Sequence, residues 1–249
     1  MNGKAANFFF DTGAWPNVMG ESEARRLGLR MTEASGSMGT MTNRTSFRTA
    51  VADDLIVGAV RLKNVSFTVL PDDGEPWSLL PLGRRGLLGM PVILAFRTLR
   101  WAQDGTVRIG EKPGPFDVRK ANLIFDNDHL AVSVGPEGRT ALAALDTGAE
   151  GTDLFGELAV QFPATLKSGE KGTTEVRGIG GAESYESVTL PEVAFEIGGI
   201  HAVLRHPGVL MKRSIRSYIG NLGLDVLQQG RAFRLDFSAM RLDLEAGGK

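Results

Sequence analysis

The sequence predicts a mainly β protein made of two homologous halves, each of which we expect to form a small β-barrel. Three observations support this prediction. A short motif occurs twice, apolar runs are short and separated by turn residues, and segments with helical periodicity are scarce. With 249 residues, 42% of them hydrophobic, the chain can bury a substantial core.

The duplicated motif is an apolar run that ends in Asp-Thr-Gly-Ala. The first copy has Phe8–Phe10 before Asp11, and the second has Leu142–Leu145 before Asp146, 135 residues further along the chain. A single Asp-Thr-Gly would be weak evidence, because so short a motif arises by chance in about one chain of this length in twenty. Two copies after similar apolar runs indicate a repeat.

A second pair of motifs keeps nearly the same spacing as the first. The Gly-Leu-Leu-Gly at Gly86–Gly89 corresponds to the Gly-Asn-Leu-Gly at Gly220–Gly223. Glycine-rich turns at Ser35–Gly39 and Arg177–Gly181 also occupy corresponding places between the motifs. Because several pairs stay in register, we interpret the chain as an internal duplication.

The segment Glu111–Pro115 contains two prolines and a glycine, which interrupt strands and helices, and it falls where the second copy should begin. We therefore expect an N-terminal lobe at residues 1–115 and a C-terminal lobe at residues 116–249. Residues with high β propensity predict strands that include Val65–Leu70, Val107–Ile109 and Val188–Ile197. Helices are expected only at Glu21–Leu27, in the turn after Gly89, and at Asp225–Gln229.

Asp11 and Asp146 are the candidate catalytic residues. Two close carboxylates that share one proton supply both a base that activates water and an acid that protonates the leaving group. Their neighbours suit a tight turn, since glycine permits close backbone approach and threonine can hydrogen-bond across to the other half. These supporting residues are Thr12, Gly13, Thr147 and Gly148.

An apolar strand ending in Asp-Thr-Gly-Ala, a glycine-rich turn and a Leu-Leu-Gly type motif resemble the retropepsin and pepsin superfamily, in particular bacterial single-chain, two-lobed retropepsin-like proteins. The resemblance covers nearly the whole chain, twice. It implies two β-barrel lobes related by a pseudo-twofold axis, with a water molecule held between Asp11 and Asp146. It also implies two flap hairpins that close over an extended peptide, with flap residues Gly39, Thr40, Gly180 and Gly181.

The sequence departs from this pattern in three places. Asn221 stands where Leu87 stands in the first half, which weakens the second motif but leaves both aspartates. Neither expected flap carries a tyrosine at its tip, so substrate gripping should differ from that of pepsin. Asn2–Phe8 resembles the hairpin turn into the first catalytic strand, and the strand that normally precedes it has almost no residues, so we expect a truncated N-terminus.

The expected function is that of a monomeric aspartic endopeptidase that acts on peptide or protein substrates and needs no cofactor. A catalytically silent peptide-binding protein on the same fold is the first alternative. The second is an unrelated β-sandwich binding module in which Asp-Thr-Gly only forms turns between strands. The separation of the two carboxylates distinguishes these possibilities.

Composition excludes several other classes. With 28 basic and 29 acidic residues, the chain has no electrostatic footprint for nucleic acid. No cysteine is present, and the three histidines have no familiar metal-ligand spacing. No Gly-x-Ser-x-Gly elbow supports a serine hydrolase. No apolar run reaches the roughly 18 residues of a membrane span, and no signal peptide is visible, so periplasm, export and cytoplasm all stay open.

Overall fold

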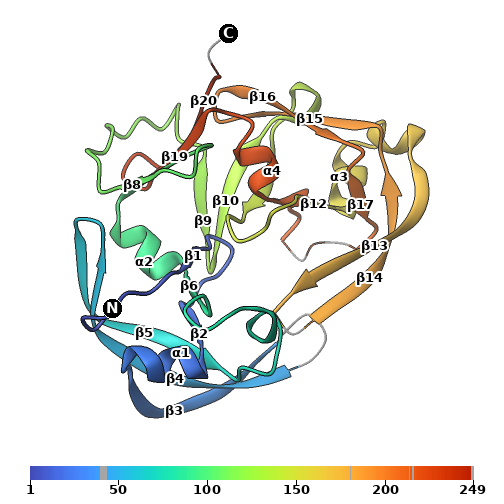
Figure 1. Ribbon diagram of the computed structural model, residues 1–249. Coiled ribbons are helices and arrows are strands. Elements are labelled where there is room, and N and C mark those ends of the chain that lie inside the picture. Colours follow the sequence, from blue (N-terminus) through green and yellow to red (C-terminus); the bar gives the residue numbers. More distant parts are fainter. Residues whose placement is uncertain (40–43, 180, 213, 215, 248–249) are drawn as a thin grey trace. The chain divides into compact units, whose positions relative to one another are not determined.

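The computed structural model describes residues 1–39, 44–179, 181–212, 214 and 216–247. Strands dominate these residues, so the predicted mainly β class is confirmed (Figure 1). Contacts divide the chain into two compact units. Unit 1 comprises Met1–Ala95 and Glu175–Ser184, and unit 2 comprises Phe96–Thr174 and Tyr185–Lys249.

Unit 1 contains a six-stranded sheet in the order β1-β6-β2-β5-β4-β3. Its strands are β1 (Phe9–Phe10), β2 (Val18–Gly20), β3 (Arg30–Gly39), β4 (Arg44–Val57), β5 (Val60–Leu70) and β6 (Gly86–Leu88). Two α-helices and a short 3-10 helix accompany it, namely α1 (Glu21–Leu27), η1 (Trp77–Leu79) and α2 (Met90–Ala95). Helix α1 ends where predicted because Gly28 adopts a left-handed conformation, with φ of 70°, that few other residues tolerate.

A sheet of eight strands has the order β13-β14-β17-β12-β18-β11-β10-β9. Most of its residues belong to unit 2, and its segment Glu175–Ser184 belongs to unit 1. Its strands are β9 (Leu123–Asp126), β10 (His129–Val134), β11 (Ala141–Leu145), β12 (Asp153–Phe155), β13 (Glu170–Gly178), β14 (Gly181–Thr189), β17 (Gly208–Leu210) and β18 (Gly220–Leu222). The helical segments are η2 (Pro136–Gly138), α3 (Gly156–Gln161), η3 (Thr165–Ser168) and α4 (Leu224–Leu227). Helix α3 was not predicted from the sequence.

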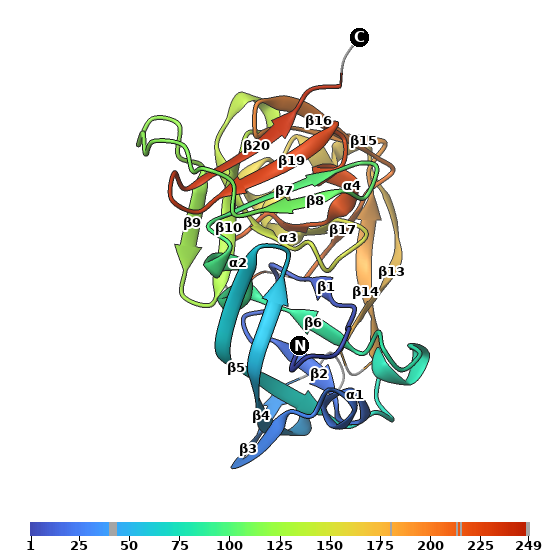
Figure 2. The same ribbon diagram turned by 60° about the vertical axis from the view of Figure 1, so that its left-hand side comes forward.

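A third sheet, in the order β20-β19-β7-β8, also lies in unit 2 (Figure 2). It consists of β7 (Thr98–Ala102), β8 (Val107–Ile109), β19 (Ala232–Asp236) and β20 (Arg241–Glu245). Strands β7 and β8 precede residue 115 in the sequence and nevertheless pair in this unit. The compact units therefore follow tertiary contacts, and the division into homologous lobes at residues 115 and 116 stays a prediction.

The expected small barrels are a wrong prediction, because no sheet among the described residues closes on itself. The corresponding strands of the two halves also differ in continuity. Strands β4 and β5 are long and continuous, whereas the corresponding run in the second half is interrupted at Pro191 and Pro207, which cannot donate a backbone hydrogen bond. The predicted strand at Val188–Ile197 is consequently split, and β15 (Glu192–Ile197) pairs with β16 (Ile200–Arg205) as a separate two-stranded sheet.

The motif-bearing strands pair in the same way in both units. Strand β1 runs parallel to β6, as β11 does to β18. Strand β2 is antiparallel to β6, as β12 is to β18. Strand β2 also runs parallel to β5, as β12 does to β17. Each Asp-Thr-Gly turn therefore follows a strand that lies beside the strand of its Gly-x-x-Gly motif.

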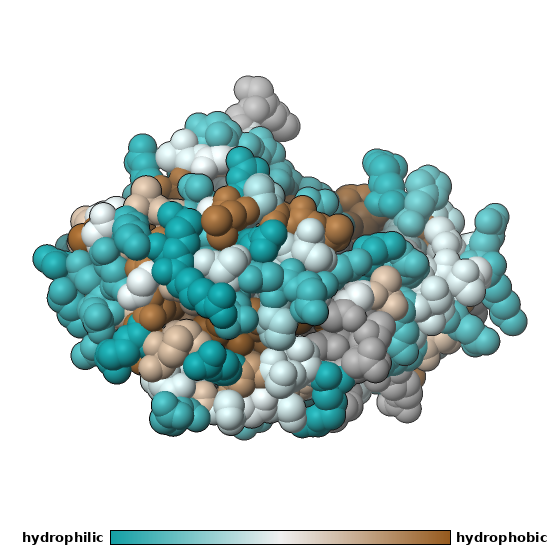
Figure 3. Space-filling view, turned by 60° about the horizontal axis from the view of Figure 1, so that its bottom comes forward, coloured by the Kyte–Doolittle hydropathy of each residue, from teal (hydrophilic) through white to brown (hydrophobic). Residues whose placement is uncertain are grey.

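Each unit has its own buried aromatic side chains. Trp77 and Phe67 are almost fully buried in unit 1, and Phe195 and Phe233 in unit 2. The face drawn in Figure 3 is mainly hydrophilic, with separate hydrophobic patches. Burial of these large rings contributes to the stability of each unit.

Candidate active site

Asp11 lies in a turn that its own carboxylate helps to close. Its backbone N–H donates to the carbonyl oxygen of Leu88, over 3.0 Å, which continues the pairing of β1 with β6. Its Oδ1 accepts hydrogen bonds from the backbone N–H groups of Gly13 and Ala14, at 2.9 and 3.0 Å. The side chain of Asp11 is thus oriented by the backbone directly after it.

Asp146 lies in a matching turn in unit 2, with one difference. Its backbone N–H donates to the carbonyl oxygen of Leu222 over 2.9 Å, and its Oδ1 accepts from the N–H of Gly148 over 2.9 Å. The N–H of Ala149, however, points to the backbone oxygen of Asp146, at 3.4 Å. The side-chain amide of Asn221 instead donates to Oδ2 of Asp146, over 2.8 Å.

The last glycine of each Gly-x-x-Gly motif supports the neighbouring turn. The residue after Gly89 donates its N–H to the carbonyl oxygen of Ala14, and the residue after Gly223 does the same to Ala149, both over 2.9 Å. A Cβ at Gly89 would lie 2.6 Å from the carbonyl oxygen of Ala14, and one at Gly223 would lie 2.9 Å from that of Ala149. Only glycine allows this approach.

Two supporting residues were missed in the sequence. Asn17 accepts a hydrogen bond from the N–H of Gly89 through Oδ1, at 2.9 Å, and Thr152 accepts one from the N–H of Gly223 through Oγ1, at 3.0 Å. Both residues lie six positions after their aspartate. A polar side chain at the same position of both copies was the signal that could have identified them.

Among the predicted supporting residues, Thr12 and Thr147 are buried, with 2% and 4% of their surfaces exposed. Gly13 and Gly148 are exposed and each supplies the N–H that orients its aspartate. The expected threonine hydrogen bonds across the two halves stay a prediction.

Of the predicted flap residues, Gly39 and Gly181 lie at the ends of strands. Gly39 is the last residue of β3 and pairs with Arg44 of β4, and Gly181 is the first residue of β14. Thr40 and Gly180 lie outside the described residues. Of the second hairpin, the segment Glu175–Ser184 belongs to unit 1.

In unit 1, Ile179 of this segment packs against a cluster of buried side chains. The cluster consists of Val18, Leu70, Trp77 and Leu87, and Ala14 of the Asp11 turn packs against it as well. An apolar surface therefore adjoins the first aspartate turn, and the second predicted flap contributes to it.

The surroundings of Asp146 are more acidic and polar. Burial raises the pKa of the Asp153 carboxyl, and the charges of Asp146 and Asp225 raise it further. Thr152 donates two hydrogen bonds to Asp225, from its backbone N–H to Oδ2 at 3.0 Å and from its hydroxyl to Oδ1 at 2.5 Å. A carboxyl group that resists ionisation thus lies close to the second candidate catalytic residue.

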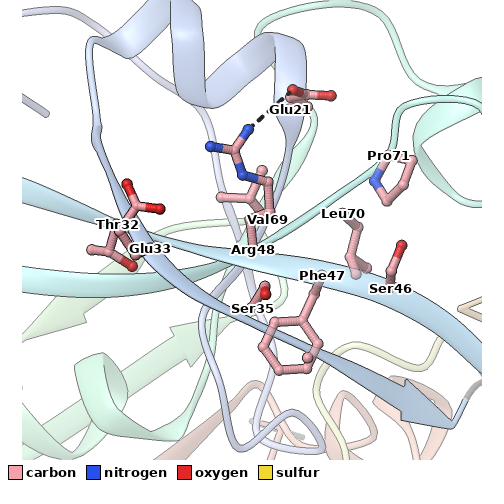
Figure 4. Close-up of a pocket in the computed structure, with 11 residues that line it drawn as sticks. Glu21, Thr32, Glu33, Ser35, Ser46, Phe47, Arg48, Val69, Leu70 and Pro71 are labelled. Carbon is pink, nitrogen blue, oxygen red and sulfur yellow. Dashed lines mark ion pairs between the residues drawn. The ribbon is translucent and has the colours of Figure 1, made fainter.

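A pocket of about 510 Å³ opens in unit 1 beside the base of the β3–β4 hairpin (Figure 4). The register of the two strands shifts between Met31 and Ser35, which separates them locally. Glu21 and Arg48 form a long ion pair of 4.0 Å within it. Neither Asp11 nor Gly39 lines this pocket, and we assign it no part in the chemistry.

The described part of the chain offers no group of three or more His, Cys, Asp or Glu side chains arranged to hold a metal ion. In that same part, no helix is long and apolar enough to cross a membrane.

Comparison with known families identifies the first of the two motif copies. Residues 1–92 match the model of an aspartyl protease family of the retropepsin-like clan. The match includes Asp11, Thr12 and Gly13 and the first Gly-x-x-Gly motif, and it ends before the second copy. No curated protein matches the chain.

Proposed function

Starting from an N-terminal segment that matches the aspartyl protease family, we propose that this protein is an aspartic endopeptidase. In this proposal Asp11 and Asp146 together hold a water molecule and hydrolyse a peptide bond. One carboxylate takes a proton from the water molecule while the oxygen of that water attacks the peptide carbonyl carbon. The other carboxyl group gives its proton to the carbonyl oxygen, and proton transfer to the amine then releases the products.

The observation that carries the proposal is the same local arrangement around both aspartates. Each follows a strand that runs parallel to a Gly-x-x-Gly strand, and each carboxylate accepts the N–H of the glycine two residues later. A turn that only connects two strands does not require a Gly-x-x-Gly motif on the neighbouring strand. The repeated pairing thus favours a two-part site over the β-sandwich alternative.

The four-stranded sheet supports the finer proposal of two homologous lobes related by a pseudo-twofold axis. Strands β7 and β19 occupy corresponding places in the two halves and pair antiparallel with each other. Arg100 is the direct partner of Arg234, the residue that corresponds to it in the second half. Pairing of equivalent residues is what a local twofold axis produces. Because one chain carries both aspartates, we propose that the monomer is active.

The test is incubation of the purified chain with a diverse peptide library, followed by mass spectrometry of the products. We expect internal cleavage that stops when a statine-type transition-state mimic is added. Capture of peptides without cleavage would instead favour the catalytically silent peptide-binding protein. If no peptide of the library is cleaved and the mimic does not bind, the proposed function is overturned.

A further inference from the structure

The two halves differ in one pair of residues beside the candidate catalytic turns. In unit 1, Val18 of β2 is the cross-strand partner of Leu87 of β6, and both side chains are buried. In unit 2, Asp153 of β12 is the partner of Asn221 of β18 in the corresponding place. An apolar pair in one half is thus matched by a polar pair in the other.

The polar pair is connected to Asp146 through the amide of Asn221. That amide donates to Oδ2 over 2.8 Å, while the N–H of Gly148 donates to Oδ1 over 2.9 Å. The two oxygens of Asp146 therefore have separate donors, one from the backbone and one from a side chain 75 positions away. Two donors on opposite oxygens restrict rotation of the carboxylate plane.

We propose that Asn221 is a positioning residue for Asp146, whose carboxylate it holds in one orientation. This inference rests on the proposed function. A donor to a carboxylate favours its charged form. Asp146 then takes the proton from the attacking water, and Asp11 gives its own proton to the peptide carbonyl oxygen.

Asp146 has acidic neighbours in unit 2. Asp153 lies on β12 and Asp225 in the first turn of α4, and the charges of Asp225 and of Asp146 itself act on the Asp153 carboxyl. Burial, with these charges, raises the pKa of Asp153 and limits how much negative charge that residue itself adds. The amide of Asn221 is the side-chain donor to Asp146 in these acidic surroundings.

The key variant restores the apolar pair of the first half. Asn221→Leu combined with Asp153→Val places the residue types of Leu87 and Val18 at the corresponding positions of the second half. The polar pair is thereby replaced by the apolar pair that unit 1 has at this place. Asn221→Leu alone leaves Asp153 beside leucine, and Asp153→Val alone retains the donor. Asn221→Gln keeps an amide on a longer side chain and serves as the conservative variant.

The kinetic test compares these proteins on one uncharged peptide across pH. We expect Asn221→Leu and the double variant to lose about 10- to 100-fold in kcat, with KM changed less than about threefold. The acidic limb of kcat/KM should move to higher pH in Asn221→Leu. Asp153→Val should keep kcat within about threefold, and Asn221→Gln should recover part of the loss. An unchanged kcat and pH profile in Asn221→Leu would overturn the proposal.

A second readout does not depend on turnover. Carbon-13 NMR of the aspartate carboxyl groups, with the Asp146 signal identified by its loss in Asp146→Asn, follows the ionisation of this residue directly. We expect its titration to move to higher pH in Asn221→Leu, and an unchanged titration would overturn the role of Asn221. If the titration moves while no peptide is cleaved by the wild-type protein, the proposed function fails and the effect of Asn221 on Asp146 stands.

Discussion

Gly89 lies so close to Pro16 that a Cβ on the glycine would be 2.4 Å from the proline carbonyl oxygen. A Cβ on Gly223 would lie equally close to the carbonyl oxygen of Gly151. We expect Gly89→Ala and Gly223→Ala each to destabilise the protein by about 2 to 3 kcal/mol, because backbone must move to admit the methyl group. Thermal and urea unfolding would measure this.

The matched control for these variants is Gly74→Ala, since a Cβ there meets nothing within 4 Å. Its stability should stay within about 0.5 kcal/mol of wild type. Equal stability of Gly89→Ala and Gly74→Ala would contradict the close packing of the Gly-x-x-Gly motif against the Asp11 turn.

Replacement of either candidate catalytic residue should separate activity from folding. Asp11→Asn and Asp146→Asn each remove one member of the acid/base pair while preserving the shape of the side chain. We expect turnover to fall by about 10³-fold or more and the melting temperature to stay near that of wild type. Peptide cleavage assays and calorimetry would check this. Substantial residual hydrolysis in both purified variants would mean that the duplicated motif is not the catalytic pair.

The four-stranded sheet predicts an acid-dependent loss of stability. Hydrogen bonds from Arg100 of β7 lower the pKa of Glu245 of β20 to about 2, and Arg231 adds to this effect. The free carboxyl group has a pKa of about 4.3, so this stabilisation is complete above that pH and is lost as the pH falls toward 2. At neutral pH we expect Glu245→Gln to lower the free energy of unfolding by about 1 to 2 kcal/mol, since the ion pair with Arg100 is partly exposed.

The measurement is the free energy of unfolding of both proteins between pH 7 and about pH 2. The difference between wild type and Glu245→Gln should shrink as the pH falls. Glu192→Gln, which affects an exposed pair with Arg205, is the control and should change little. A difference that is constant across this pH range would exclude Glu245 as the titrating group.

Two fragments of different length would test whether β7 stabilises unit 2. Trp101 of β7 packs against Phe233 of β19, with ring centroids 5.7 Å apart, and β7 covers one edge of β19. A fragment of residues 116–249 lacks this cover, whereas residues 96–249 retain it. We expect the longer fragment to unfold at higher temperature and to aggregate less, because an uncovered strand edge promotes association. Equal behaviour in circular dichroism and light scattering would contradict this account.

Ile179 should hold the tip of the second hairpin in unit 1. Apart from packing on the apolar cluster, this tip has an exposed ion pair between Arg177 and Glu75, which contributes little stability. We expect Ile179→Ser to increase amide hydrogen exchange within residues 175–184. Ile124→Ser, at a half-exposed position of β9, should leave that exchange unchanged. Unaltered exchange in Ile179→Ser would show that other contacts hold the tip.

Elements with a strong local signal could be predicted from the sequence. Helix α1 has the predicted bounds Glu21–Leu27, because its apolar spacing and the following Gly28 define it without distant contacts. Strand β8 has the predicted bounds Val107–Ile109 for a similar reason. The two Asp-Thr-Gly turns were also predictable, since each carboxylate is bound by the backbone of the next few residues.

Features that join distant segments were decided by the tertiary structure. The open sheets depend on pairings between strands that are separate in the sequence. The pairing of β7 with β19 joins strands more than a hundred residues apart, for which no local pattern exists. Asn221 illustrates the same limit, because in the sequence it was only a departure from the Gly-Leu-Leu-Gly motif of the first half. Its amide reaches Asp146 because β18 lies beside β11 in the folded sheet. Spacing and residue type thus determined the two candidate aspartates, whereas strand pairing determined which side chain orients the second.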